Sequence, residues 1–183
     1  MDEGNGAVKW KLTEWLTKFE ADPMNSIAVD TNVLVCIYSG IPNIGRKYAE
    51  LLGDLSTKYN LVIPKLVYGE LSLIFSTSKQ LNNFLSDTGL IIGDIEPEAY
   101  IIAAKRWDKY NKSRVLICQR CGKILEKLTC GQCGIEIKIG QHILTDFVIG
   151  AYALQTSGRK IVTNDKGYFS TYFPELTIIS TDP

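Results

Sequence analysis

The sequence predicts an α/β domain in which a mostly parallel central sheet is flanked by helices. Short apolar segments rich in β-branched residues alternate along the chain with segments of helical periodicity. The apolar segments are continuous rather than alternating, which is typical of strands buried on both faces of a parallel sheet. With 183 residues, of which 45% are hydrophobic and 22% charged, the chain is long enough for one sizeable domain and a small appendage. This composition argues against global disorder.

The predicted elements of the main domain begin at residue 26. Pro64 and Pro97 favour helix starts, because proline fits the first helical turn, and Gly158 is suited to ending a helix. Expected strands cover residues 26–35, 61–63, 90–95, 160–163 and 176–180. Expected helices cover residues 44–59, 64–75, 79–86, 97–111 and 141–156, with a turn or brief helix over 166–172.

Residues 1–25 form a separate N-terminal arm. Apolar side chains recur at steps of three and four between Trp10 and Phe19, with charged residues between them. This spacing predicts an amphipathic helix that ends near Asp22 and packs on the main domain. A helix that binds a partner or a second copy of the chain is the alternative.

The net charge of zero conceals two oppositely charged parts. The chain has 20 Lys and Arg residues and 20 Asp and Glu residues. Nine basic and only three acidic residues fall between positions 103 and 140, so this segment carries +6 and the rest of the chain −6. The overall balance therefore does not exclude a nucleic-acid partner, because one segment alone is markedly cationic.

The chain carries no recognisable signal for a membrane or for export. No apolar run approaches the roughly 18 residues that a membrane-spanning helix needs. Asp2 and Glu3 precede any apolar stretch, whereas a secretion signal starts with basic residues. We expect a cytoplasmic protein that does not act at a membrane.

Four acidic residues stand alone in segments that are otherwise suited to burial. Asp30 is interpreted as the end of the first strand, within the apolar segment 26–35, and Asp165 follows the strand at 160–163. The carboxyl ends of parallel strands form a ligand-binding crevice. Glu70 and Asp146 lie on predicted helices. Glu70 is the only charged residue between Lys65 and Lys79, and Asp146 carries the only formal charge between Lys138 and Arg159. If the helices direct both acids at the same crevice, four carboxylates meet there. Each acid taken alone could instead be a helix cap or one half of a local salt bridge.

Four neighbouring carboxylates repel one another unless they share protons or bind divalent cations. Oxygen ligands of this kind suit Mg²⁺ or Mn²⁺. Such a site activates a water molecule and stabilises the charge that develops on a phosphodiester during hydrolysis. The residues therefore predict metal-assisted hydrolysis.

Two Cys-x-x-Cys-Gly motifs predict a second metal site. Each motif brings two thiolates to one ion, and the glycine permits the tight turn that follows. The two motifs together supply the four ligands of a structural Zn²⁺ ion: Cys118, Cys121, Cys130 and Cys133. A redox role is the alternative. The fifth cysteine, Cys36, is expected to be a small buried hydrophobic residue.

The segments around the four acids resemble PIN domains. The resemblance rests on residues 27–35, 66–71, 145–154 and 160–169, and it covers about 26–112 and 138–181. It implies that four acids are ligands of Mg²⁺ or Mn²⁺ and that two polar residues orient the carboxylates or the attacking water. The implied ligands are Asp30, Glu70, Asp146 and Asp165, and the supporting residues are Asn32 and Thr163.

The resemblance also implies an activity and a set of partners. PIN domains are metal-dependent ribonucleases, as in VapC-type toxins and ribosomal-RNA-processing endonucleases. The expected function is hydrolysis of phosphodiesters in single-stranded or structured RNA, with an antitoxin or a ribosome-processing factor as a partner. Similar proteins commonly form homodimers, so a homodimer is expected here as well.

The cysteine motifs mark a departure from the plain toxin pattern. The PIN-like domain, residues 26–112 and 138–183, is interrupted by an inserted zinc ribbon over 113–137. Some RNA-processing PIN proteins carry a zinc ribbon, typically after the domain. The ribbon is expected either to contact RNA through its basic residues or to be purely structural.

Two other functions compete with the nuclease. One is a catalytically inactive module that binds RNA or protein, although an inactive site has no need of all four acids. The other is a phosphatase with an aspartate nucleophile, which ranks last because Thr31-Asn32 supplies no second acid after Asp30. His142, four residues before Asp146 on the expected helix, either contacts phosphate, carries protons or is simply a polar residue near the helix start.

Overall fold

The computed structural model describes residues 25–113, 116–125, 129–135, 142–156 and 158–181. The predicted helix of the N-terminal arm falls on residues 1–24, outside the described residues. Within the described ranges, no helix is long and apolar enough to cross a bilayer.

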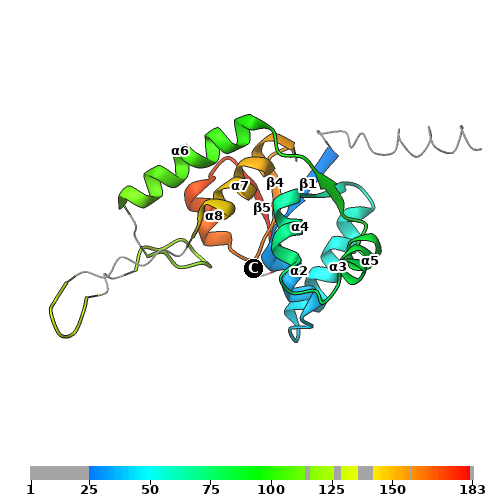
Figure 1. Ribbon diagram of the computed structural model, residues 1–183, viewed down its shortest axis with the longest axis horizontal. Helices are drawn as coiled ribbons and strands as arrows, with labels where there is room; N and C mark the ends of the chain where they lie inside the picture. Colours follow the sequence, from blue (N-terminus) through cyan, green and yellow to red (C-terminus); the bar gives the residue numbers. More distant parts are fainter. Residues whose placement is uncertain (1–24, 114–115, 126–128, 136–141, 157, 182–183) are drawn as a thin grey trace, which may run out of the picture.

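A parallel sheet forms the centre of the domain (Figure 1). Its five strands lie in the order β3-β2-β1-β4-β5, and every neighbouring pair is parallel. The register places Ala28 of the central strand beside Val62 on one side and Ile161 on the other. The strands are β1 (Ser26–Val29), β2 (Asn60–Pro64), β3 (Ile91–Gly93), β4 (Lys160–Val162) and β5 (Thr177–Ile179).

Helices cover both sides of this sheet. In Figure 1, α6, α7 and α8 lie on one side of the strands, and α2 to α5 lie on the other. The helices are α2 (Thr31–Tyr38), α3 (Ile44–Ser56), α4 (Lys65–Leu71), α5 (Ser78–Asp87), α6 (Pro97–Ser113), α7 (Leu144–Thr156) and α8 (Lys166–Tyr172). The layered arrangement confirms the α/β prediction.

The core lies between the sheet and the two helical layers. Ile27, Ala28 and Val29 of the central strand are fully buried. Phe147 on α7 and Tyr48 on α3 are fully buried as well. The continuous apolar character of β1 therefore has the predicted cause, since the strand has no solvent-facing side. Cys36 is buried, as predicted.

The largest difference from the predicted elements is at the first strand. The strand ends at Val29, and the residues predicted to extend it to position 35 form helix α2 instead. Asp30 has extended backbone angles and is the N-cap residue of this helix. An apolar, β-branched run is compatible with a buried strand or a buried helix, so periodicity alone did not separate the two.

The other differences are at element boundaries. Helix α4 ends at Leu71 rather than near residue 75, and α7 begins at Leu144 rather than at residue 141. Proline at position 64 is the last strand residue and the N-cap of α4, so the helix starts one residue later than predicted.

Candidate active site

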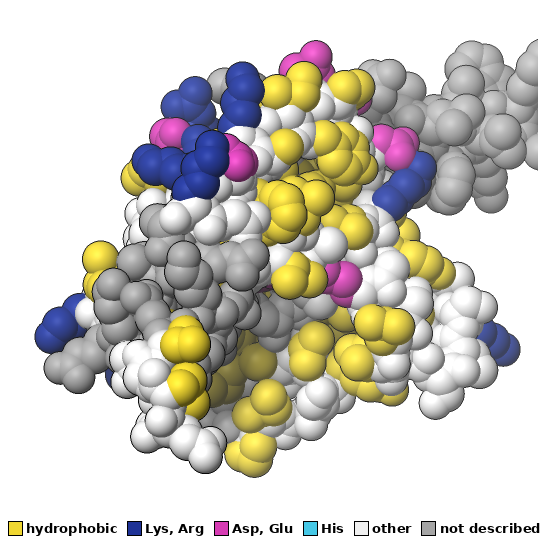
Figure 2. Space-filling view, turned by 60° about the vertical axis from the view of Figure 1, so that its left-hand side comes forward, with side chains coloured by type: hydrophobic (Ala, Val, Ile, Leu, Met, Phe, Trp, Pro, Cys, Tyr) yellow, Lys and Arg dark blue, Asp and Glu magenta, His cyan; other side chains and the backbone are white. Residues whose placement is uncertain are grey.

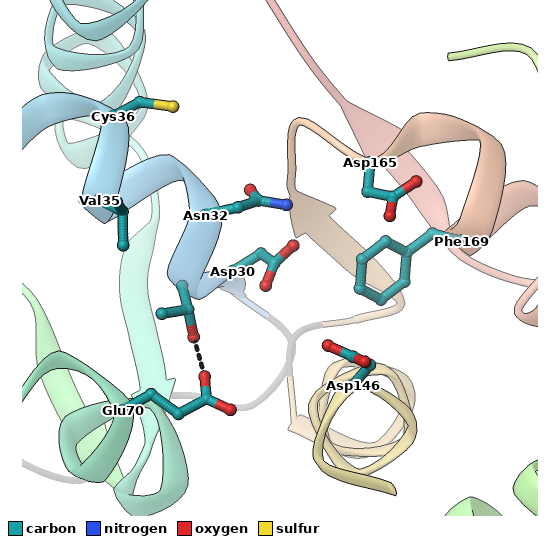
Figure 3. Close-up of a pocket in the computed structure, with 9 residues that line it drawn as sticks. Asp30, Asn32, Val35, Cys36, Glu70, Asp146, Asp165 and Phe169 are labelled. Atoms are coloured by element: carbon teal, nitrogen blue, oxygen red, sulfur yellow. Dashed lines mark hydrogen bonds between the residues drawn. The ribbon is translucent and has the colours of Figure 1, made fainter. Parts of the chain in front are cut away.

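A cavity of about 380 Å³ lies at the carboxyl ends of β1 and β4. All four of the predicted acids line it. Figure 3 shows Asp30, Asp146 and Asp165 facing the space between α2, α7 and α8, with Glu70 approaching from α4. The complete lining comprises Asp30, Thr31, Asn32, Val35, Cys36, Glu70, Asp146, Asp165 and Phe169. The topology thus brings together four segments that are far apart in the sequence.

Asp30 is the most buried of the four carboxylates. Only 7% of the residue is exposed, and its Oδ2 atom accepts a hydrogen bond of 2.7 Å from the Thr163 hydroxyl. Burial raises the pKa of Asp30 to about 7, against the lowering effect of the Thr163 bond. The negative charges of Asp146, Asp165 and Glu70 raise this pKa further.

Thr163 connects Asp30 to two other residues of the site. Its side-chain oxygen accepts a hydrogen bond of 3.0 Å from the backbone N–H of Asp165 and a longer one of 3.4 Å from the Asn32 amide. The Asn32 side chain in turn accepts a hydrogen bond from the backbone N–H of Asn164 at 3.1 Å. Thr163 is fully buried behind Asp30, whereas Asn32 lines the cavity. Both predicted supporting residues therefore lie beside the carboxylates.

Asp165 and Asp146 each have a second, local role at a helix start. Asp165 is the N-cap of α8, and its Oδ1 accepts a hydrogen bond from the Tyr168 N–H at 3.1 Å. Asp146 lies in the first turn of α7, and its Oδ2 accepts one from the Ile143 N–H at 2.7 Å. The helix-cap alternative is thus correct for these two acids, yet both also line the cavity. Capping explains their placement and does not exclude a role in the site.

The pKa of Asp165 is raised, chiefly by burial. Its hydrogen bond from Tyr168 and the nearby His142 oppose this rise, whereas the charge of Asp146 adds to it.

Glu70 is held by a residue that the sequence did not single out. The hydroxyl of Thr31, the first residue of α2, donates a short hydrogen bond to Glu70 Oε2 (Figure 3). This bond connects α2 to α4 at the edge of the cavity and fixes the direction of the Glu70 carboxylate.

His142 lies between two of the acids. Its Nδ1 is 3.7 Å from Asp146 Oδ2, and its Nε2 is 3.9 Å from Asp165 Oδ2. The ring stacks on Tyr168 with centroids 3.9 Å apart, and Nε2 is buried without a hydrogen-bond partner. The expectation that His142 lies on the same helix as Asp146 is wrong, because α7 begins at Leu144. Its side chain is only 5% exposed, so it is buried beside these two carboxylates.

The donor set fits a divalent cation by its chemistry. The side chains in the cavity that bear charge are all carboxylates, which suit Mg²⁺ or Mn²⁺. Burial is the main cause of the raised pKa of Asp30, and the repulsion from the other three acids adds to it; a bound cation would offset this repulsion. Among the described residues, no three His, Cys, Asp or Glu side chains are already close enough to hold an ion.

The cysteine motifs form two tight turns. In the first, the Gly122 N–H donates to the Cys118 carbonyl at 2.8 Å, and in the second, the Gly134 N–H donates to the Cys130 carbonyl at 2.9 Å. Both glycines have positive φ angles, of 73° and 72°, as the predicted turns require. Bonds from nearby backbone N–H groups lower the pKa of Cys118 and of Cys130, which favours their thiolate forms. Each motif thus forms its predicted turn. Among the residues that the structure describes, the four cysteines do not come together as a metal-binding group, so a shared Zn²⁺ ion stays a prediction.

The structure adds site residues for which the sequence offered only weak signals. Thr31, Val35 and Cys36 lie on α2 and line the cavity, and the interpretation of this segment as a strand concealed their place there. Phe169 lies four residues after Asp165, on the short helix that follows it, and this spacing could have identified it.

Comparisons with known proteins show which solved structures have a similar fold. No protein-family model and no curated protein sequence matches the chain. Among solved structures, the chain is similar to the VapBC2 complex from Rickettsia felis bound to a DNA fragment from its promoter. The TM-score is 0.56 and the identity 17%, and the match covers 84% of this chain and 97% of that one. The chain is also similar to DNA-bound VapBC from Salmonella typhimurium, with a TM-score of 0.52 and 17% identity over 86% of this chain and 98% of that one. The fold is therefore PIN-like, as the sequence resemblance predicted.

Proposed function

We propose that the protein is a divalent-metal-dependent endoribonuclease. The observation that carries this proposal is the shared cavity of Asp30, Glu70, Asp146 and Asp165 at the carboxyl ends of the central strands. Four acids that come from different segments and line one opening in a PIN-like fold are the arrangement that metal-assisted phosphodiester hydrolysis needs. A toxin-type ribonuclease and an RNA-processing enzyme would both use this site.

The residues of the site have distinct roles in this proposal. A bound Mg²⁺ or Mn²⁺ ion supplies charge neutralisation and an activated water molecule. Asp30 and Asp165 extend from the ends of strands, and Thr163 fixes the distance between them through its bonds to both residues. Thr31 orients Glu70 in the same way from the opposite side of the cavity. Asn32 keeps the turn after β4 in place by accepting the Asn164 N–H.

We propose that single-stranded RNA binds to a basic surface formed by α6 and the first cysteine turn. Helix α6 carries exposed Lys105, Lys109 and Lys112, and the first cysteine turn carries exposed Arg120. Figure 2 shows Lys and Arg side chains gathered at one edge of the face that it presents. Contacts between these cations and phosphates would provide affinity without reading the base sequence.

Two further parts of the proposal concern zinc and partners. Zn²⁺ would bind Cys118, Cys121, Cys130 and Cys133, since each motif already forms a turn with favoured thiolates.

The similar solved structures are VapBC complexes with DNA, which supports an antitoxin-like protein as a partner of this chain. A homodimer remains a prediction.

Cleavage of labelled single-stranded RNA in Mn²⁺ tests the proposal. Asp30→Asn and Asp146→Asn should each abolish cleavage, because each removes a negative ligand from the cavity. Asp54→Asn is the matched control, since Asp54 is exposed on α3 and does not line the cavity. If all four proteins cleave alike, or none cleaves, the nuclease assignment is wrong, and the inactive RNA- or protein-binding module becomes the better account.

A further inference from the structure

The first cysteine turn, residues 118–122, packs directly against the start of α8. The Gly167 N–H donates a hydrogen bond of 2.5 Å to the Gln119 carbonyl. A Cβ atom at Gly167 would lie 2.1 Å from the Cys118 carbonyl oxygen and 2.6 Å from the Gly122 nitrogen. Only glycine leaves space for this backbone-to-backbone contact.

The contact demands glycine on the other side as well. A Cβ atom at Gly122 would lie 2.9 Å from Thr171 Oγ1 and 3.2 Å from the Gly167 carbonyl oxygen. Gly122 also has a φ angle of 73°, which disfavours other residues. Two glycines from distant parts of the chain therefore face each other across one interface.

This interface lies within two residues of a carboxylate of the proposed active site. Asp165 caps α8 by accepting the Tyr168 N–H, and the neighbouring Gly167 N–H is accepted by the cysteine turn. The first N–H groups of a helix have no partners inside the helix, so these two bonds satisfy adjacent donors of its opening turn. The position of Asp165 is thus tied to the position of the cysteine turn.

Neither partner in this contact is self-sufficient. Helix α8 has only seven residues, too few to be stable alone. The cysteine turn belongs to an insertion of about 25 residues, which is too small to bury an adequate core of its own. Among its described residues, strand-like pairing consists of one isolated bridge, between Ile117 and Ile124, and the other backbone hydrogen bonds lie within the two turns. Metal binding is what orders modules of this kind.

We propose that the first cysteine turn is a metal-dependent brace for α8, and that Gly167 is a positioning residue for Asp165. Zn²⁺ at the four cysteines fixes the turn, the turn fixes the start of α8, and Asp165 is held where it can share an ion with the other carboxylates. This inference rests on the proposed function of the carboxylate site. Coupling between two binding sites is reciprocal, so Mn²⁺ in the cavity also strengthens Zn²⁺ binding.

The test compares zinc-loaded full-length protein with Cys130→Ser. Cys130 lies in the second cysteine turn, so this variant removes a zinc ligand and leaves the residues that touch α8 unchanged. Hydrogen exchange at the amides of residues 166–169 should accelerate in the variant, whereas exchange in β1 should not change. Affinity for Mn²⁺, measured by titration calorimetry, should fall by about tenfold. Unchanged hydrogen exchange and unchanged Mn²⁺ affinity would contradict the proposal that the cysteine turn is a brace for α8.

Gly167→Ala tests the contact itself while leaving all four cysteines in place. We expect this variant to retain one equivalent of Zn²⁺ and to lose Mn²⁺ affinity as Cys130→Ser does. Gly131→Ala is the matched control, because a Cβ atom at Gly131 meets nothing within 4 Å. If Gly167→Ala binds Mn²⁺ as tightly as Gly131→Ala does, the contact does not position Asp165. If Gly167→Ala fails to fold, the Cys130→Ser comparison decides the question.

The two proposals fail in different ways. If zinc-loaded wild-type protein does not cleave RNA in Mn²⁺, the proposed nuclease function is wrong. In that case, hydrogen exchange at residues 166–169 and affinity for Mn²⁺ still show whether the cysteine turn is a brace for α8, because neither measurement requires catalysis.

Discussion

The Thr163 hydroxyl donates a hydrogen bond of 2.7 Å to Asp30, the most buried acid of the cavity. The bond joins the ends of two adjacent central strands, β1 and β4, at the place where the carboxylates meet. It also opposes the effect of burial on the pKa of Asp30. The same oxygen accepts the Asp165 N–H, so one side chain sets the relative position of two acids.

Thr163→Val should therefore weaken both stability and the site. Loss of the bond leaves a buried carboxylate without this partner, at a cost of about 1–3 kcal/mol in the free energy of unfolding. It also raises the pKa of Asp30 further, because the bond that lowers it is gone. Urea denaturation and the pH dependence of RNA cleavage measure the two effects. Thr163→Ser keeps the hydroxyl and should behave like wild type, and equal behaviour of Val and Ser variants would contradict this role.

The raised pKa of Asp30 predicts that stability depends on pH in the absence of added Mg²⁺ or Mn²⁺. An aspartate with a pKa of about 7 in the folded state and about 3.9 in the unfolded state binds more protons when folded. The free energy of unfolding should therefore fall as the pH rises from about 4 to about 7. The raised pKa of Asp165 acts in the same direction.

Asp30→Asn should remove much of this pH dependence. An amide carries no charge at any pH, so the variant should be more stable than wild type near pH 8 by about 2–4 kcal/mol. Urea denaturation at pH 5 and pH 8 measures the difference. Asp54→Asn, at an exposed position, should leave the pH dependence unchanged. A steeper fall in stability with pH for Asp30→Asn than for wild type would be inconsistent with a buried Asp30 carboxyl whose pKa is raised.

Thr31→Val tests whether the orientation of Glu70 matters for metal binding. Thr31 donates to Glu70 across the edge of the cavity, and valine has nearly the same shape without the hydroxyl. We expect Mn²⁺ affinity to fall by about tenfold, equivalent to roughly 1.4 kcal/mol. Thermal shift in a Mn²⁺ titration reports this change, since ligand binding to the folded state raises the midpoint. Thr31→Ser should bind Mn²⁺ as wild type does, and weak binding by both variants would point to a packing defect instead.

Paired charge removal tests the basic surface. Arg120→Gln with Lys123→Gln removes two exposed cations, one in the first cysteine turn and one directly after it. If both contact phosphates, the slope of log affinity against log salt for single-stranded RNA should decrease by about 1.4, because each contact contributes about 0.7. Lys47→Gln with Lys58→Gln makes the same charge change on and just after α3, away from the insertion. Equal slopes for the two double variants would assign the insertion a structural role alone.

The sequence predicted the fold class because burial and alternation of elements are encoded locally. Continuous apolar strands can be recognised without knowing their neighbours, and β2, β4 and β5 lie within a few residues of their predicted bounds. Helix α2 was missed because Val33, Leu34 and Cys36 are all buried, so the segment lacks the polar face that marks most helices.

The four acids were predictable for a related reason. A charge in an apolar segment is costly unless it has a partner, and Asp30, Glu70, Asp146 and Asp165 all proved to line one cavity. The contact between Gly167 and the cysteine turn could not be predicted. It depends on how an insertion packs on a helix about 50 positions later in the chain, and neither segment carries a local signal for the other.

Anomalous diffraction from crystals of the zinc-loaded protein soaked in Mn²⁺ shows directly whether the four acids bind a metal ion. We expect a manganese peak in the cavity within about 2.0–2.6 Å of carboxylate oxygens from Asp30 and at least one of Glu70, Asp146 and Asp165. The peak should be absent in Asp30→Asn crystals treated in the same way. Manganese bound elsewhere on the protein, with none between these carboxylates, would contradict the assignment of this cavity as a metal-dependent active site.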